Sequence, residues 1–230
     1  MSKRNVSIVL AHGAWADGSS WAKVIAPLQV QDFEVMAAPL PLTTLADDVA
    51  AIQRTIVRAK YPVVLVGHAY AGAVIAEVRS EKVKALVYVA ALAPDEGEKV
   101  ADVFYRTEPH PQAPKLAPDD NGLIWLPYNA FAESFAQNAK TEEQALLAAL
   151  QRPISLACIT VPVKRPLWKD VPAWYLIAEE DRMIVRDNQY FMSERMKAKV
   201  KMVRVDHTPS VTAPSAVVDI IIETVKAVGT

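Results

Sequence analysis

The sequence predicts an α/β fold with a doubly wound, mostly parallel six-stranded sheet and a small cap of helices and loops. Short apolar runs alternate along the chain with segments whose apolar residues recur at helical spacing. Polar residues that can do chemistry follow directly after several of the apolar runs. A proline-rich stretch, residues 94–171, interrupts the alternation, so it predicts an insertion between two parts of one core, residues 1–93 and 172–230.

The apolar runs are short, rich in valine and bounded by glycine, proline or acidic residues, as strands buried on both faces of a parallel sheet are. The first run ends at His12-Gly13, and Pro39 stops the second. We expect strands at residues 6–11, 33–38, 63–66, 83–91, 173–178 and 200–205.

The intervening segments have one apolar face each, which predicts helices packed on the sheet. Ser19 or Ser20 is suited to cap the first of them. In the second, Asp47, Asp48 and Arg54 fall off the apolar face. We expect helices at about residues 19–28, 45–56, 71–78, 188–197 and 214–225.

The inserted stretch is expected to lie as a cap over the strand ends. Prolines are dense between residues 109 and 127, and residues 141–144, Thr-Glu-Glu-Gln, form a capping-box pattern that predicts a helix. We expect at least half of the aromatic residues of the insertion in the core and the others in a substrate pocket. The candidate substrate-binding residues are Trp15 at the first strand end and Trp125, Tyr128 and Trp168 in the insertion.

The net charge, the length of the apolar runs and the cysteine content argue against several classes of function. The net charge of −1 in 230 residues gives no electrostatic argument for a nucleic acid or an anionic membrane as partner. The apolar run at residues 6–11 is too short for a signal peptide or a membrane span, so we expect a cytoplasmic protein. A single cysteine, Cys158, excludes an intrachain disulfide and is expected to fill space in the core. The sequence leaves a monomer and a homodimer both open.

The carboxyl ends of parallel strands meet at one edge of the sheet, and ligands of such sheets bind there. His12, residue 69, Asp181 and His207 all follow predicted strands and are therefore expected at that edge. The turn at residues 67–72, Gly-His-Ala-Tyr-Ala-Gly, follows the nucleophile-elbow pattern G-x-S-x-G, with two departures. Ala71 replaces a glycine and is a mild change, whereas Ala69 stands where the nucleophilic serine is expected.

These segments together resemble the α/β-hydrolase superfamily, and in particular its small esterase branch with the plant methylesterases and hydroxynitrile lyases. The resemblance rests on residues 12–15 (His-Gly-Ala-Trp), residues 63–68 (Val-Val-Leu-Val-Gly-His), residues 181–184 (Asp-Arg-Met-Ile) and His207, in that order. It covers nearly the whole chain except the insertion.

The resemblance implies a role for each position. Ala69 occupies the nucleophile position, His207 is the general base, and Asp181 orients the imidazole of that histidine. The backbone N–H groups of Ala14 and Tyr70 form the oxyanion hole. The implied reaction is hydrolysis of a carboxylic ester or lactone through an acyl-enzyme, on a small, uncharged and moderately hydrophobic substrate.

Alanine at position 69 admits three interpretations. The favoured one is an ester hydrolase whose serine has been replaced by Ala69, which leaves an inactive variant that still binds substrate. The second is a natural, non-catalytic protein that binds a small apolar ligand. The third is an enzyme similar to hydroxynitrile lyases that uses His207 directly as a base on the substrate.

No cofactor is expected. The histidines are too scattered for a local zinc motif of the H-E-x-x-H type, and the chain contains no Walker A sequence. Residues 67–72 lie between a strand and a helix but lack the G-x-G-x-x-G spacing of a dinucleotide site.

Overall fold

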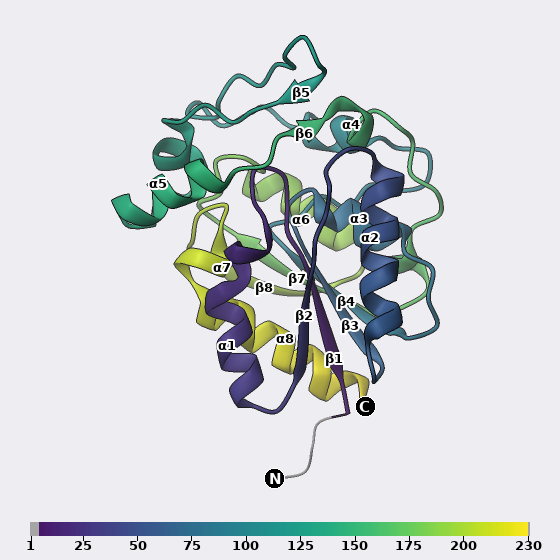
Figure 1. Cartoon of the computed structure of the whole chain (residues 1–230). Helices are drawn as coiled ribbons and strands as arrows, with labels where there is room; N and C mark the ends of the chain where they lie inside the picture. Colours follow the sequence, from purple (N-terminus) through teal and green to yellow (C-terminus); the bar gives the residue numbers. More distant parts are fainter. Residues whose placement is uncertain (1–4, 230) are drawn as a thin grey trace.

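Six strands form one parallel sheet in the computed structural model, which describes residues 5–229 (Figure 1). Their order across the sheet is β2-β1-β3-β4-β7-β8, and every neighbouring pair is parallel. The predicted doubly wound, parallel six-stranded sheet is thereby confirmed. The strands are β1 (Ser7–Ala11), β2 (Glu34–Ala38), β3 (Val63–His68), β4 (Val83–Val89), β7 (Ala173–Ala178) and β8 (Lys199–Val203).

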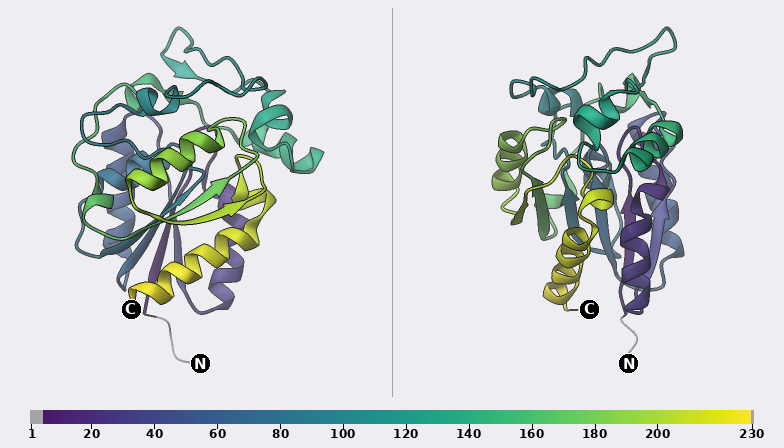
Figure 2. Two further views of the ribbon diagram at one scale, coloured as in Figure 1. Left: turned by 180° about the vertical axis from the view of Figure 1, so that it is seen from behind. Right: turned by 90° about the vertical axis from the view of Figure 1, so that its left-hand side faces the viewer.

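Helices cover both faces of the sheet, because successive strand residues point to opposite faces and both sets are apolar. On β1, Ile8 and Leu10 pack with α1 (Ala22–Val30) and α8 (Pro214–Val228). Val9 and Ala11 belong to the opposite core, which holds the apolar residues of the other helices. Among these helices are α2 (Leu45–Arg58), α3 (Ala71–Glu77) and α6 (Arg186–Arg195). The two views in Figure 2 show this three-layer arrangement.

Element boundaries differ from the sequence prediction by a few residues. β4 ends at Val89 rather than at residue 91, because Ala90 adopts a left-handed backbone with φ of 45°. β8 ends at Val203 rather than at residue 205, and α6 begins at Arg186 rather than at residue 188. A short 3₁₀ helix, Gly18–Trp21, precedes α1, and Asp17 rather than a serine caps it by accepting the N–H of Ser19.

Most of residues 94–171 lie beyond the carboxyl ends of the strands, in teal and green at the top of Figure 1, and residues 164–171 run back past the C-terminal end of α3 to the amino end of β7. The inserted stretch contains a two-stranded antiparallel pair that the sequence did not predict, because each strand is only two residues long. The helix expected at residues 141–144 is α5, which begins at Thr141 with Lys140 as its cap residue and with Glu143 accepting the N–H of Lys140. The elements here are α4 (Val100–Phe104), β5 (Leu123–Ile124), η2 (Phe131–Phe135), α5 (Thr141–Leu150), β6 (Ile154–Ser155), η3 (Leu156–Cys158) and η4 (Leu167–Lys169).

The strand order places a topological switch at β1 and β3. From β1 the chain crosses to β2 on one side, and from β3 it crosses to β4 on the other. The loops that follow β1 and β3 therefore separate at the carboxyl edge and leave room for a ligand between them. Among residues 5–229, no helix combines the length and the apolar character needed to cross a membrane.

Candidate active site

Position 69 lies in a strained turn between β3 and α3. Ala69 has φ of 50°, a left-handed conformation that is uncommon for residues other than glycine and costs an alanine about 1 kcal/mol. Small neighbours make the turn possible: a Cβ on Gly67 would lie 2.8 Å from the carbonyl oxygen of Ala71, and a Cβ on Gly13 would lie 2.9 Å from Cβ of Ala69. The turn thus has the backbone geometry of a nucleophile elbow, with a methyl group in place of a nucleophile.

Two backbone N–H groups beside Ala69 have no protein partner. Within residues 5–229, neither Ala14 N–H nor Tyr70 N–H donates to a protein acceptor, and both residues line the same pocket as Ala69. The loop that carries Ala14 is held by its neighbour Trp15, which donates its backbone N–H to Arg152 O over 3.0 Å and its indole N–H to Ile124 O over 2.9 Å. Two unpaired backbone N–H groups at one pocket are what an oxyanion hole requires.

His207 and Asp181 form a buried pair on the other side of position 69. Nδ1 of His207 lies 2.8 Å from Oδ2 of Asp181, and both side chains are almost fully buried. The other oxygen of Asp181 accepts the N–H groups of Met183 and Ile184 at 2.7 and 2.8 Å. Because the carboxylate of Asp181 can only accept, Nδ1 of His207 donates to it, and in the neutral form of the ring Nε2 is then an acceptor.

Sequence reasoning did not find Gln189 of α6, which completes this arrangement. Its amide nitrogen donates to Oδ2 of Asp181 over 2.9 Å, and its amide oxygen accepts the N–H of Ala178 over 3.0 Å. A glutamine in a polar helix carries no sequence signal of such a role, because only the docking of α6 against β7 buries it. Asp206, the neighbour of His207, turns its carboxylate to Asn138, Thr208 and Thr212. It is therefore not the partner of the histidine.

His68 forms a hydrogen bond to the segment that carries His207. Its Nε2 lies 2.7 Å from the carbonyl oxygen of His207 and donates to it. Burial, and secondarily the nearby ring of His207, lowers the pKa of His68 to about 3, so the ring is neutral at physiological pH. His12 is equally buried: its Nδ1 donates to Gly13 O and its Nε2 accepts the N–H of Leu40. Both histidines hold loops at the strand ends.

The side chain of Tyr70 is anchored by a buried carboxylate. Its hydroxyl donates to Oδ2 of Asp48 over 2.8 Å, while Oδ1 of Asp48 accepts the N–H of Leu42 over 2.8 Å. Asp48, which the helical pattern places off the apolar face, is nevertheless fully buried, because these donors and the thiol of Cys158 replace water around it. Burial raises the pKa of Asp48, and that of Cys158 to about 12, so the thiol is unreactive and fills space in the core.

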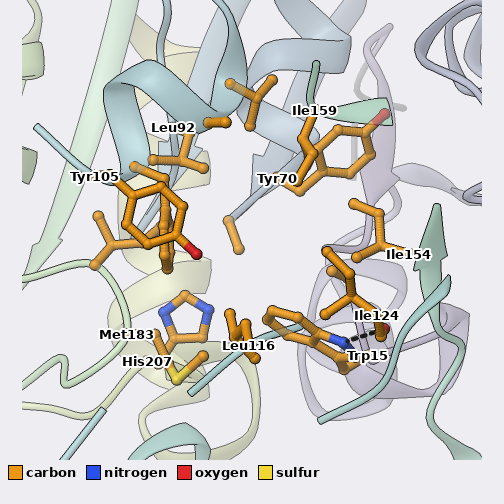
Figure 3. Close-up of a pocket in the computed structure, with 16 residues that line it drawn as sticks. Trp15, Tyr70, Leu92, Tyr105, Leu116, Ile124, Ile154, Ile159, Met183 and His207 are labelled. Carbon is orange, nitrogen blue, oxygen red and sulfur yellow. Dashed lines mark hydrogen bonds between the residues drawn. The ribbon is translucent and has the colours of Figure 1, made fainter. Parts of the chain in front are cut away.

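The candidate residues meet in one apolar pocket at the carboxyl edge (Figure 3). Ala14, Trp15, Ala69, Tyr70 and His207 all line it. Phe135 packs against His207, with ring centroids 5.2 Å apart, and shields the imidazole from water. The rest of the wall is contributed mainly by the inserted stretch and by the loop after β7: Val100, Phe104, Tyr105, Leu116, Ile124, Ile154, Ile159, Met183 and Ile184.

The structure does not bring Trp125, Tyr128 or Trp168 to this pocket. The side chains of Trp125 and Tyr128 are 48% and 71% exposed on the outside of the insertion. Trp168 is buried in the core that lies beneath α3 and the insertion. Aromatic composition alone could not separate these surface and core positions from lining ones, because that depends on how the insertion folds back over the sheet.

The described residues, 5–229, include no group of three or more histidine, cysteine, aspartate or glutamate side chains placed to hold a metal ion. The arrangement at the pocket holds an imidazole, an oriented carboxylate and a pair of N–H donors. Such a combination of groups is typical of hydrolases of the α/β class.

The chain belongs to the alpha/beta hydrolase family, whose sequence pattern it matches over residues 8–220. Among curated relatives it is 24% identical to the alpha/beta hydrolase nvfD of Aspergillus novofumigatus, over 94% of each chain. It is 25% identical to the probable hydrolase R7 of a Phoma species, over 94% of this chain and 96% of that one.

Solved structures share the fold at lower identity. A pyrethroid hydrolase from Sphingobium faniae superposes with a TM-score of 0.83 at 21% identity, over 96% of this chain and 98% of that one. Polyneuridine aldehyde esterase gives 0.78 at 20% identity, over 95% and 98% of the two chains. A methylesterase from Arabidopsis gives 0.76 at 16% identity, over 96% and 99%.

Proposed function

We propose that the pocket is an acyl-transfer site of the carboxylic ester or lactone hydrolase type. The observation that carries this proposal is the strained turn at Ala69, which lies between a pair of free N–H groups and a buried His–Asp pair. Strain of this kind is retained where a reacting group must be presented to a ligand.

Each part has a role in this chemistry. A hydroxyl at position 69 would attack the carbonyl carbon while Nε2 of His207 accepts its proton, and Asp181 would keep the imidazole in the required tautomer. The N–H groups of Ala14 and Tyr70 would stabilise the oxyanion, each by about 3–4 kcal/mol in the transition state. His207 would then protonate the leaving alkoxide.

The substrate class follows from the pocket wall. The lining side chains are predominantly aliphatic and aromatic, and none carries a permanent charge. Such a wall favours a small, uncharged and moderately hydrophobic ester or lactone, because a charged group would lose its hydration without gaining a partner. Two proteins of similar structure are named as an esterase and a methylesterase, and a third as a pyrethroid hydrolase, which agrees with this class.

With Ala69, the chain binds such a ligand but forms no acyl-enzyme. Removing the nucleophile from a serine hydrolase costs roughly 10⁶ in turnover while the pocket and the N–H donors stay in place. The chain therefore binds ligands at a hydrolase-type site without cleaving them. This holds whether Ala69 replaced a serine or is the natural residue.

The test is the Ala69→Ser variant on a panel of small aryl and alkyl esters and lactones. We expect turnover to rise by several orders of magnitude over the Ala69 protein, and to be lost again in the double variant with His207→Ala. Tight ligand binding with no gain in hydrolysis would indicate instead a natural ligand-binding protein. Cyanohydrin cleavage by the Ala69 protein would indicate a lyase that uses His207 as base.

A further inference from the structure

The polar groups that face the pocket define a pattern that a ligand has to match. The N–H groups of Ala14 and Tyr70 are donors without a protein partner. Nε2 of His207 has no hydrogen-bond partner within residues 5–229, although the residue is only 2% exposed. Figure 3 shows its imidazole ring among the apolar side chains of the pocket. A ligand that displaces water from these atoms without pairing with them would leave each one unsatisfied, at a cost of about 1–3 kcal/mol, so each of the three atoms favours a ligand that pairs with it.

Whether Nε2 of His207 donates or accepts a hydrogen bond is decided by the groups around Asp181, to which Nδ1 is bonded. Asp181 accepts from Met183, Ile184 and Gln189, and it therefore accepts from Nδ1 of His207 as well. A neutral imidazole with its proton on Nδ1 presents a bare lone pair at Nε2. Besides the hydroxyl of Tyr105, the pocket thus offers two backbone N–H donors and one imidazole acceptor.

In a serine hydrolase the acceptor is paired from within the protein, because the serine hydroxyl donates to Nε2 of the histidine. In this chain the side chain of Ala69 ends in a methyl group and cannot donate. His68, the nearest other polar ring, points its N–H to the carbonyl oxygen of His207 and does not reach Nε2. No described side chain donates to Nε2, and the hydroxyl of Tyr105, which lines the same pocket, makes no hydrogen bond to it, so the donor is supplied by the ligand.

We propose that this chain selects carbonyl compounds that carry their own hydroxyl beside the carbonyl, such as α-hydroxy ketones. The carbonyl oxygen accepts from the N–H groups of Ala14 and Tyr70, and the hydroxyl donates to Nε2 of His207. The apolar remainder of the ligand contacts the aliphatic wall. This inference rests on the carbonyl-binding part of the proposed function, and it goes further by stating which carbonyl compounds the Ala69 form prefers.

The experiment compares three ketones of similar size by isothermal titration calorimetry: α-hydroxyacetophenone, α-methoxyacetophenone and acetophenone. One buried hydrogen bond is worth about tenfold in affinity. We expect the Ala69 protein to bind the hydroxy ketone about tenfold more tightly than either of the other two. The methoxy compound retains the oxygen and the bulk but cannot donate, so it isolates the contribution of the O–H group.

Two variants test the assignment of the donor and the acceptor. In Ala69→Ser the new hydroxyl pairs with Nε2, so the preference for the hydroxy ketone should disappear. In Asp181→Asn the amide donates to Nδ1 and moves the ring proton to Nε2, which turns the acceptor into a donor. The hydroxy ketone should then lose its advantage over the methoxy ketone, although the fold, checked by circular dichroism, is retained.

Equal affinity of the three ketones for the Ala69 protein, or no binding of the hydroxy ketone, would overturn the inference. Hydrolysis of esters by Ala69→Ser together with equal ketone affinities would reject this ligand preference alone and leave the proposed function standing. Failure of Ala69→Ser to hydrolyse any ester, with no ketone bound by either protein, would reject the carbonyl site itself.

Discussion

His68 makes the stability of this protein depend on pH between pH 6.5 and about 3. The ring is fully buried next to position 69 and donates from Nε2 to the carbonyl oxygen of His207. Burial lowers its pKa from 6.5 to about 3. The informative perturbation is His68→Gln, which retains an N–H donor but removes the titrating group.

The sign and size follow from proton linkage. Between pH 6.5 and about 3 the unfolded chain binds a proton at His68 and the folded protein does not, so the free energy of unfolding rises with pH in this window. That stability is fully present above pH 6.5 and is lost as the pH falls towards 3. At about 1.4 kcal/mol per pH unit, the whole interval corresponds to roughly 5 kcal/mol, and the part above about pH 5 to roughly 2 kcal/mol.

The assay is urea unfolding of the original protein and of His68→Gln at a series of pH values. Between about pH 6.5 and about pH 5 we expect the original protein to lose roughly 2 kcal/mol more than His68→Gln. His110→Gln, in a loop of the insertion, is the matched control and should behave as the original protein does. The buried His12 is present in all three proteins, so its contribution cancels. Parallel pH dependences of the original protein and His68→Gln would refute the reasoning.

Three further changes address the site. In the Ala69→Ser background, Asp181→Asn should lower kcat for esters by roughly 10⁴ with an unchanged circular dichroism spectrum; a loss below tenfold would contradict the role of this carboxylate. Gly13→Ala places a Cβ 2.9 Å from that of Ala69 and should destabilise the fold by about 1–3 kcal/mol, seen as a lower Tm. Tyr70→Phe removes the donor at 2.8 Å from the buried Asp48 carboxylate and should cost about 1–3 kcal/mol in urea unfolding; no change would mean that this carboxylate finds another donor.

The fold was accessible from sequence because its signals are local and repeated. The valine-rich run at residues 63–66 reads as a strand buried on both faces, and the glycines around it indicate the sharp turn into α3. The positions of Asp181 and His207 followed from chain order, since each lies just beyond a strand of the parallel sheet. Strand and helix ends were less accessible, because single backbone conformations such as that of Ala90 decide them.

The supporting residues of the site could not be predicted in the same way. Asp48 sits among polar neighbours at the start of α2 and reads as a solvent residue until Tyr70, Leu42 and Cys158 are brought around it. Gln189 acquires its role only when α6 docks on β7. The lining of the pocket by the insertion depends on contacts between residues far apart in sequence, for which periodicity carries no information.

The central claim is that position 69 is the nucleophile position of an acyl-transfer site, between the N–H pair of Ala14 and Tyr70 and the base His207. The most direct measurement is covalent labelling of Ala69→Ser with an aryl fluorophosphonate, followed by peptide mass spectrometry. We predict one phosphonyl adduct at position 69, none in the Ala69 protein, and strongly slowed labelling when His207→Ala is added. No adduct, or an adduct at a different residue, would contradict the claim.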